Sequence, residues 1–328
     1  MNEHRVSSFF RCFTSKNLHK NDPDFLSQIF MNRKSLLILT SLFLLSIVLL
    51  FVLTPDAPSK SYYTNIQSPL VIAHQGGDGV WPGDTMYAFE KAVEIGADVL
   101  EMDAHMTKDS QIVLMHDEKI DRTTEGTGLI ENLSLSELKK LDAAYKWSID
   151  DGKTFPYRGQ GIEVPTLEEL FQKFPQMRYV IEIKLTQNPI DKPLCDLIRK
   201  YGMQDKVVVA SFHDEAMQNF RKTCPEVATS ASRGEVTRFV LLGKVLLSGL
   251  VAPQYQSIQP PYDPKESKNI PIMTKRFIRE AHAKNVKVEP WTVDDPDLMK
   301  QYIEWDVDGI MTDRPDLMLE VLKDLDIR

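Results

Sequence analysis

Residues 99–103, VLEMD, form a short apolar run in which two acidic side chains alternate with hydrophobic ones. Residues two positions apart in a strand point to the same face, so Glu101 and Asp103 are expected to point the same way. The run VIEIK at 180–184 repeats the pattern with Glu182 and Lys184. Because buried charges are costly unless they are paired or bound to a metal, the repetition on separate strands predicts a functional site.

Two histidines extend this pattern to further strand ends. His74 directly follows the apolar run 70–73, and His116 follows the run 112–115. Taken singly, a histidine at a strand end is more often a structural residue, and Glu-x-Lys is more often a surface ion pair. The conjunction of these groups on successive strand ends favours a site.

The alternation of predicted strands and helices from residue 70 onward indicates an α/β fold. Strands are expected at 70–73, 99–103 (with 112–115 as its extension), 178–183, 207–211, 228–231, 257–259, 286–292 and 309–312. Helices are expected at 85–95, 166–174, 190–201, 213–223, 235–250, 274–285, 296–305 and 315–325. This order favours a (β/α)8 TIM barrel over a doubly wound open sheet, because barrel enzymes carry catalytic residues at the C-terminal ends of several strands. The glycine-punctured residues 117–161 indicate a small insertion after the second strand.

An apolar stretch precedes the predicted barrel. Residues 36–53, LLILTSLFLLSIVLLFVL, carry no charge and suffice for a slightly short membrane span. The flank before them is rich in Lys and Arg, so the positive-inside rule predicts a cytoplasmic N-terminus and an extracytoplasmic barrel. The expected organisation is a cytoplasmic tail 1–34, a transmembrane anchor 35–54, a linker 55–68 and a barrel 69–328.

A cleaved signal peptide is the alternative to the anchor. Translation from Met31 would place Met-Asn-Arg-Lys directly before the apolar run, and cleavage would yield a secreted protein. The apolar core is longer than a usual signal core, and no clean small-residue cleavage site follows it. These two features favour the anchor.

Charge and cysteine content limit the remaining possibilities. The net charge of −8 argues against a nucleic-acid-binding protein, since such proteins present basic surfaces. Cys195 and Cys224 can pair in an oxidising compartment, although their spacing does not decide the matter. The sequence leaves the oligomeric state open.

The residue types suit metal-assisted cleavage of a phosphodiester. Glu101, Asp103 and Glu182 supply hard oxygen ligands, which suit Ca²⁺ or Mg²⁺ better than zinc. His74 and His116 can share the acid and base roles, because imidazole titrates near neutrality. Lys184 can add a positive charge toward the phosphate.

These segments resemble the glycerophosphodiester phosphodiesterase family. The family pattern runs His-Arg-Gly, Pro-Glu-Asn-Thr, Glu-x-Asp, Thr-x-Asp, His-Asp and Glu-x-Lys. The corresponding segments here are 74–76, 82–85, 101–103, 107–109, 116–117 and 182–184, with a C-terminal signature at 291–293 and 308–315. The resemblance covers about residues 70–325.

The resemblance implies a TIM barrel with a small insertion, a divalent cation and a role for each site residue. It implies that His74 and His116 are the acid/base pair, without saying which is which. It further implies a metal held by Glu101, Asp103 and Glu182. Residues Gln75, Lys184 and Trp291 are the expected contacts to the phosphate and the rest of the substrate.

Two departures from the family pattern raise an alternative. Gln75 stands where the family has an arginine, so a fixed charge and a bidentate fork are lost. Gly83-Asp84 replaces Glu-Asn, and Asp84 is one position along from the missing carboxylate. The alternative is a catalytically weakened relative that binds phosphodiesters or lipids.

The apolar residues 239–251, FVLLGKVLLSGLV, bear on the substrate. They are too few to span a bilayer, and they suit either a barrel helix or an interfacial, acyl-chain-binding surface. Together with the anchor they resemble the membrane-anchored, lysophospholipase D-like branch of the family. The expected substrates are therefore glycerophosphodiesters and lysophospholipids.

Overall fold

The computed structural model describes residues 33–184, 189–267 and 269–328. The chain divides into two units at Leu53, and each is described here by itself. The first contains the helix α2 (Arg33–Leu53), within which Ser35–Leu53 is long and apolar enough to cross a membrane. The tail predicted at 1–34 lies almost wholly outside the described residues.

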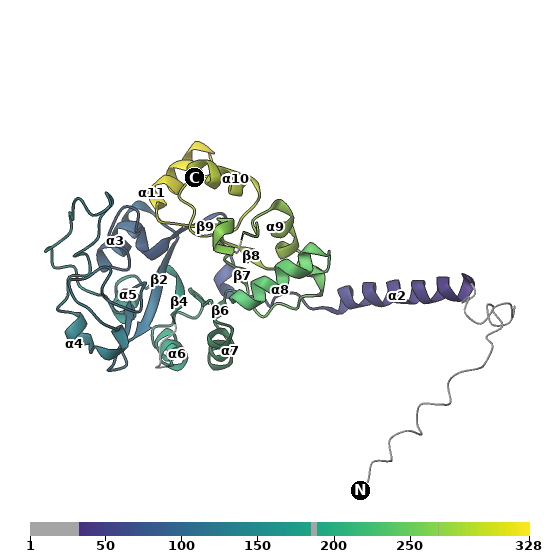
Figure 1. Cartoon of the computed structure of the whole chain (residues 1–328), viewed down its shortest axis with the longest axis horizontal. Coiled ribbons are helices and arrows are strands. Elements are labelled where there is room, and N and C mark those ends of the chain that lie inside the picture. Colours follow the sequence, from purple (N-terminus) through teal and green to yellow (C-terminus); the bar gives the residue numbers. More distant parts are fainter. Residues whose placement is uncertain (1–32, 185–188, 268) are drawn as a thin grey trace, which may run out of the picture. The chain divides into compact units, whose positions relative to one another are not determined.

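The second unit, Thr54–Arg328, is built on a curled parallel sheet (Figure 1). Its strands follow the order β6-β5-β4-β2-β1-β9, and a separate parallel pair joins β7 to β8. The parallel strands are β1 (Leu70–Ala73), β2 (Val99–Met106), β4 (Arg178–Ile183), β5 (Val207–Ala210), β6 (Ala228–Thr229), β7 (Ser257–Ile258), β8 (Lys287–Val288) and β9 (Gly309–Thr312).

Backbone hydrogen bonds continue across both gaps between these sheets. A parallel bridge between Ser230 and Ser257 connects the end of β6 to β7. On the other side, the Asp308 amide donates to the Val288 carbonyl at 2.9 Å, and the Met311 amide donates to the Pro290 carbonyl at 3.0 Å. The bonding therefore runs from β6 through β7 and β8 to β9.

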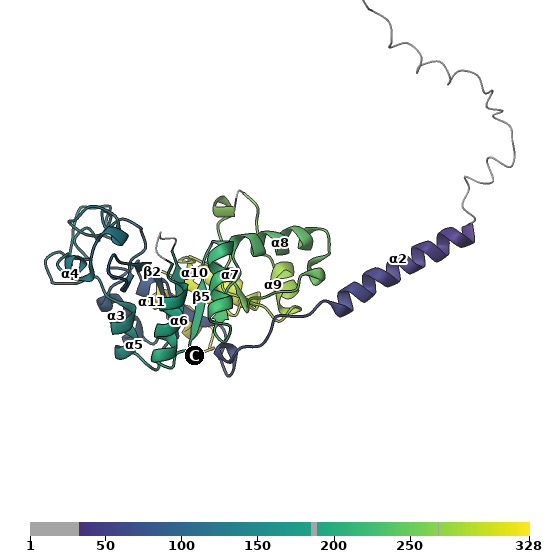
Figure 2. The same cartoon turned by 90° about the horizontal axis from the view of Figure 1, so that it is seen from below.

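Helices follow most strands and cover the outer face of the sheet (Figures 1 and 2). They are α3 (Met86–Ile95), α5 (Leu167–Lys173), α6 (Asp191–Lys200), α7 (Asp214–Thr223), α8 (Arg233–Lys244), α9 (Lys275–His282), α10 (Pro296–Glu304) and α11 (Pro315–Asp324). Capping boxes at Thr166 and Ser232 begin α5 and α8, because each hydroxyl accepts from the N3 amide while the N3 glutamate accepts in return. The expected helix 235–250 is interrupted: α8 ends at Lys244, and a short 3₁₀ turn, η4 (Ser248–Leu250), follows.

Alternate strand residues pack on opposite faces. Val71 and Ala73 belong to the large cluster that includes the helices, whereas Leu70 and Ile72 belong to a smaller cluster made of strand residues. All three buried hydrophobic clusters found among the described residues lie within Thr54–Arg328. This unit therefore contains the core of a self-contained α/β fold.

The stretch 112–115 does not extend the second strand as expected. Instead β3 (Ile112–Leu114) runs antiparallel to the end of β2, with Ala104 opposite Leu114. The reversal is made by a tight turn in which the Thr107 amide donates to the Gln111 carbonyl at 2.9 Å and Ser110 is left-handed, with φ 61°. The insertion after this hairpin contains η3 (Ile130–Asn132) and α4 (Leu135–Leu138). It has its own buried cluster: Val113, Met115, Ile120, Ile130, Leu138, Ala143 and Val164.

The segment expected as a linker, 55–68, is packed against the rest of its unit. The Ala57 amide donates to the Lys284 carbonyl at 2.9 Å. The turn η1 (Ser61–Tyr63) places Tyr62 in the inner cluster with 1% exposure, and the Tyr63 hydroxyl donates to Glu289 at 3.0 Å. Burial of the Tyr62 ring and the hydrogen bond of Tyr63 therefore attach this segment to the rest of the unit.

Candidate active site

The C-terminal ends of the parallel strands surround a pocket of about 410 Å³. It is lined by six of the site residues expected from the sequence: His74, Glu101, His116, Glu182, Lys184 and Trp291. Asp103 lies beneath the pocket with 1% exposure, and Gln75 lies beside it, next to Asp84. The sequence-predicted residues are therefore brought to one place by strands that are far apart in the chain.

The acidic residues of β2 and β4 form a compact cluster. One carboxylate oxygen from each of Glu101, Asp103 and Glu182 lies within 4.8 Å of the others. The Lys184 Nζ lies 2.9 Å from both Asp103 Oδ1 and Glu182 Oε1. Asp103 Oδ2 is buried without a hydrogen-bond partner. An unsatisfied buried carboxylate oxygen within a set of hard oxygen donors fits a divalent cation such as Ca²⁺ or Mg²⁺.

The electrostatics of this cluster also favour a bound cation. Burial, with the negative charge of Asp103, raises the pKa of Glu101 to about 8. The same two causes raise the pKa of Glu182. Carboxylates that repel one another in a poorly solvated place are stabilised in their charged form by a positive ion.

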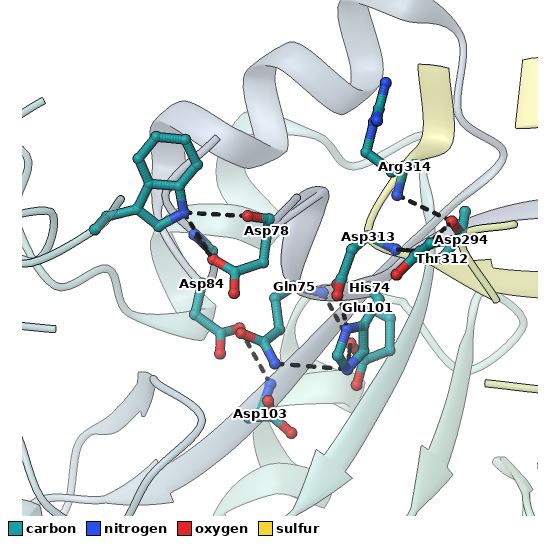
Figure 3. Close-up of polar contacts among 12 residues, drawn as sticks. His74, Gln75, Asp78, Asp84, Glu101, Asp103, Asp294, Thr312, Asp313 and Arg314 are labelled. Atoms are coloured by element: carbon teal, nitrogen blue, oxygen red, sulfur yellow. Dashed lines mark hydrogen bonds and ion pairs between the residues drawn. The ribbon is translucent and has the colours of Figure 1, made fainter. Parts of the chain in front are cut away.

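His74 is held at the end of β1 by the carboxylate of Asp313, which directly follows β9 (Figure 3). It begins the turn η2 (His74–Gly76), and its Nδ1 lies 2.6 Å from Asp313 Oδ1. Its Nε2 lies 3.9 Å from Glu101 Oε2. Burial alone would lower the pKa of His74, but the charges of Glu101 and Asp313 outweigh it and raise that pKa to about 10. The ring is therefore oriented and readily protonated.

His116, which lines the same pocket, is held in a similar way. Its Nδ1 lies 2.6 Å from Asp117 Oδ1, and Asp117 Oδ2 accepts from Arg122 Nε at 2.7 Å. The His116 side chain is 42% exposed, against 19% for His74. Both imidazoles thus have a carboxylate on Nδ1, which leaves Nε2 as the nitrogen free to exchange a proton with a substrate.

The two departures from the family pattern lie next to each other. Gln75 is left-handed, with φ 50°, and its amide donates to Glu101 Oε2 at 2.9 Å. Its side-chain nitrogen lies 3.5 Å from His74 Nε2. Gln75 therefore orients a predicted metal ligand through its backbone and contacts a histidine through its side chain.

Asp84 places a carboxylate beside the acidic cluster (Figure 3). It is 4% exposed, its Oδ1 accepts from the Asp103 amide at 3.3 Å, and its Oδ2 is buried without a partner. Burial and the charge of Asp103 raise its pKa well above the usual value. Gly83 cannot carry a side chain here without a shift, because its Cβ would lie 2.6 Å from Asp78 Oδ1. Asp84, and not residue 83, therefore supplies the carboxylate beside the acidic cluster.

Several pocket residues were not predicted from the sequence. Gln259 and Phe212 are two of them: the Gln259 carbonyl accepts from Nε1 of the predicted Trp291 at 2.8 Å, and the Phe212 ring meets the Trp291 ring edge-on with the ring centroids 5.7 Å apart. Arg233, the first residue of α8, and Glu266, in the 3₁₀ turn η5 (Pro264–Ser267), line the same pocket. Asp313 lies within the C-terminal signature at 308–315, and its position directly after a strand is the signal that could have identified it.

The sequence matches the Glycerophosphoryl diester phosphodiesterase family over residues 74–317. The chain belongs to this family. A glycerophosphodiester phosphodiesterase of Caldanaerobacter subterraneus is 30% identical over 263 residues, which cover 77% of this chain and 98% of the relative. The human lysophospholipase D GDPD1 is 26% identical over 276 residues, covering 76% of this chain and 85% of the relative.

Solved structures of the family share the fold. A phosphodiesterase of Oleispira antarctica, determined with the product sn-glycerol 3-phosphate, superposes with a TM-score of 0.60 at 22% identity, covering 78% of this chain and 97% of that one. A structure from Galdieria sulphuraria named as a putative glycerophosphodiester phosphodiesterase superposes with a TM-score of 0.62 at 25% identity, covering 79% and 100%. The family resemblance expected from the motifs is confirmed, and so is the α/β class. The protein is a phosphoric diester hydrolase of the glycerophosphodiester phosphodiesterase family, a family that generally uses a divalent metal.

Proposed function

We propose that this family member hydrolyses glycerophosphodiesters to an alcohol and glycerol 3-phosphate with the help of a divalent cation. The observation that carries the proposal is the pair of carboxylate-held histidines, His74 and His116, lining one pocket with the acidic cluster. The glycerol 3-phosphate bound to the Oleispira antarctica phosphodiesterase supports the same product here.

Glu101, Asp103 and Glu182 would hold the cation, either Ca²⁺ or Mg²⁺. When bound, it would supply Lewis-acid polarisation of the phosphoryl oxygens. Lys184 provides a further positive charge at the same place, since its Nζ contacts two of these carboxylates. Trp291 offers an apolar wall for the glycerol, and Gln75 offers an amide in place of the family's arginine.

The histidines would move the protons. Because an aspartate accepts from Nδ1 of each ring, Nε2 of one can take a proton from the attacking water while Nε2 of the other gives one to the leaving alcohol. His74 is the stronger candidate for the acid, since the Asp313 carboxylate on its Nδ1 favours the protonated ring.

Substitution of each histidine tests the proposal directly. His74→Ala and His116→Ala should each lower kcat for glycerophosphocholine by at least roughly a hundredfold. His282→Gln is the matched control, because His282 is also bound to an aspartate, Asp308, at 2.7 Å but does not line the pocket. Activity that is indifferent both to chelation and to the histidine variants would refute the proposal.

A catalytically weakened relative is the second candidate, favoured by Gln75 and Gly83. Binding of glycerophosphocholine without release of choline at long times would support it. A related outcome is a cyclic phosphate product, as formed by spider-toxin phospholipases D with the same barrel and paired histidines. Phosphorus NMR distinguishes the three outcomes: glycerol 3-phosphate from hydrolysis, a cyclic phosphate from cyclisation, and unchanged substrate from binding alone.

We further propose that α2 is an uncleaved membrane anchor and that the eight parallel strands close as a (β/α)8 barrel on the extracytoplasmic side. The 19 uncharged, mostly apolar residues Ser35–Leu53 would extend about 28 Å as a helix, close to the thickness of a bilayer core. The disulfide between Cys195 and Cys224 supports an oxidising compartment. Protease added to intact cells should digest the barrel but leave the N-terminal tail protected. Release of the barrel into the medium with a new N-terminus after residue 53 would favour a cleaved signal instead.

Lysophospholipids are the proposed second substrate class. The similarity to human lysophospholipase D GDPD1, at 26% identity, supports it. The head group and glycerol of such a lipid would occupy the pocket, with its acyl chain extending outside. Choline release from lysophosphatidylcholine and from glycerophosphocholine, measured side by side, decides the preference.

A further inference from the structure

An exposed apolar surface lies at the C-terminal end of α8. Leu241, Val245 and Leu246 have 54%, 61% and 70% of their surface exposed. Among the described residues of the barrel unit, Thr54–Arg328, Ile149 is the only other large hydrophobic residue that is more than half exposed. Exposed apolar residues gathered in this way mark interaction surfaces more often than scattered ones do.

The backbone at Leu246 strengthens this interpretation. Leu246 has φ 64°, the left-handed conformation that follows many helix ends and that glycine or asparagine usually adopts. A leucine there is unfavourable both for its backbone and for its exposed side chain. Position 246 therefore carries a large apolar side chain where folding alone favours a small or polar residue.

An apolar groove runs beside this surface, between α8 and α9. It has a volume of about 290 Å³. Its apolar lining comes from Phe239, Val240, Pro271, Ile272 and Phe277. Lys244, Arg276 and Glu280 also line it, and Arg276 donates to the Gly243 carbonyl.

The charge of the two helices is opposite to that of the whole chain. α8 and α9 contain six Lys or Arg residues: Arg233, Arg238, Lys244, Lys275, Arg276 and Arg279. Their acidic residues, Glu235 and Glu280, are engaged in ion pairs with Arg221 and Arg276. In a protein with a net charge of −8, two helices with this excess of basic residues fit an anionic partner.

The surface is also close to the point where the chain leaves the barrel unit. The Lys284 Nζ donates to the Thr54 carbonyl at 3.1 Å, and Thr54 directly follows α2. Lys284 comes two residues after the end of α9, and the eight residues of that helix span about 12 Å. If α2 is the proposed anchor, the bilayer surface lies within reach of α8 and α9.

We propose that Leu241, Val245 and Leu246, with the surrounding basic side chains, dock the barrel on the anionic head groups of the membrane. This inference rests on the proposed anchor and adds an orientation to it. Arg233 begins α8 and also lines the catalytic pocket, and the loop before α9 contributes Glu266 to that pocket and Ile272 to the groove. Because α8 is about 18 Å long, docking at its C-terminal end would hold the pocket at its N-terminal end within about that distance of the lipid surface from which a lysophospholipid would enter.

Vesicle binding by the isolated barrel unit, Thr54–Arg328, tests the surface without the anchor. The unit should sediment with phosphatidylglycerol vesicles and much less with phosphatidylcholine vesicles. L241S/V245S/L246N should reduce this binding by at least roughly tenfold, because the apolar side chains no longer insert. I149S is the matched control, since it removes an equally exposed apolar side chain from the insertion. R238E/K275E should reduce binding independently through charge alone.

Hydrolysis of glycerophosphocholine by the same variants separates this inference from the proposed function. It should be unchanged, whereas hydrolysis of vesicle-borne lysophosphatidylcholine should fall with binding. Binding that is equal for wild type, the apolar variant and the charge variant would overturn the proposal. A dimer of the wild-type unit that L241S/V245S/L246N abolishes, without vesicle binding, would assign the surface to a second copy of the chain and also overturn it.

Discussion

His74 Nδ1 and Asp313 Oδ1 lie 2.6 Å apart although 239 positions separate them in the chain. They directly follow β1 and β9, whose register pairs Ala73 with Thr312. Asp313 is itself fixed by Asp294, whose Oδ1 accepts from the Asp313 amide at 2.8 Å. The pairing of β1 with β9 therefore places His74 next to the carboxylate that orients its ring.

Asp313→Asn should lower kcat at least roughly tenfold with a smaller effect on KM, because the ring of His74 loses its orienting acceptor. The aspartate raises the pKa of His74, so its removal should lower that pKa. In cation-free protein, NMR titration of the ring should show the proton leaving at lower pH than in the wild type. Asp306→Asn, at an exposed aspartate outside the pocket, is the control. An unchanged titration would show that Asp313 does not govern His74.

Lys184→Gln should slow hydrolysis and yet tighten cation binding. The Nζ contacts Asp103 and Glu182, so the ammonium and a cation would compete for the same oxygens. Removing the ammonium ends that competition. It also removes the positive charge that Lys184 would direct toward the substrate's phosphate. Isothermal titration with Ca²⁺ and Mg²⁺ measures the affinity. Lys192→Gln, on the exposed face of α6, should change neither quantity. A weaker affinity in Lys184→Gln would contradict the competition.

Restoring the family's residue at position 83 should not restore activity. In Gly83→Glu the new Cβ would meet Asp78, which accepts from the Gly83 amide at 2.8 Å and from Trp147 Nε1 at 3.0 Å. We expect a lower melting temperature and no gain in rate. Gln75→Arg should raise the rate if the missing charge limits catalysis, whereas Asp84→Asn should weaken cation binding. A faster enzyme with Glu at 83 would show that Asp84 is no replacement.

Local patterns predicted the parts of the site that depend on strand periodicity. Glu101 and Asp103 share the inner face because alternate residues of a strand do, and Glu182 joins them because the register of β2 and β4 pairs it with Asp103. The pairing of His74 with Asp313 depends instead on which strands become neighbours. The direction of β3 depended on one left-handed residue, Ser110, which no periodicity reveals. Arg233 lines the pocket because α8 begins at the rim of the pocket. Predicting this contact from the sequence would have required the path of the loop that leads into α8.

Glu289 provides a polar link between the segment after α2 and the catalytic pocket. It follows β8 and is completely buried, and it accepts from the Tyr63 hydroxyl at 3.0 Å and from Gln259 Nε2 at 2.9 Å. Gln259 lines the pocket, whereas Tyr63 belongs to η1. Burial raises the pKa of Glu289 to about 7.

Glu289→Gln should flatten the dependence of stability on pH. Because the folded state raises the pKa of Glu289 to about 7, it holds the proton more tightly than the unfolded chain does. Its contribution to stability is complete below the unfolded pKa and is lost as the pH rises to about 7, by at most about 3 kcal/mol. Thermal unfolding in chelator should therefore show the wild type losing more stability than Glu289→Gln as the pH rises from weakly acidic to neutral. Glu304→Gln, at an exposed glutamate of α10, should follow the wild type. Parallel curves for wild type and Glu289→Gln would show that this carboxyl is ionised at no cost in the folded protein.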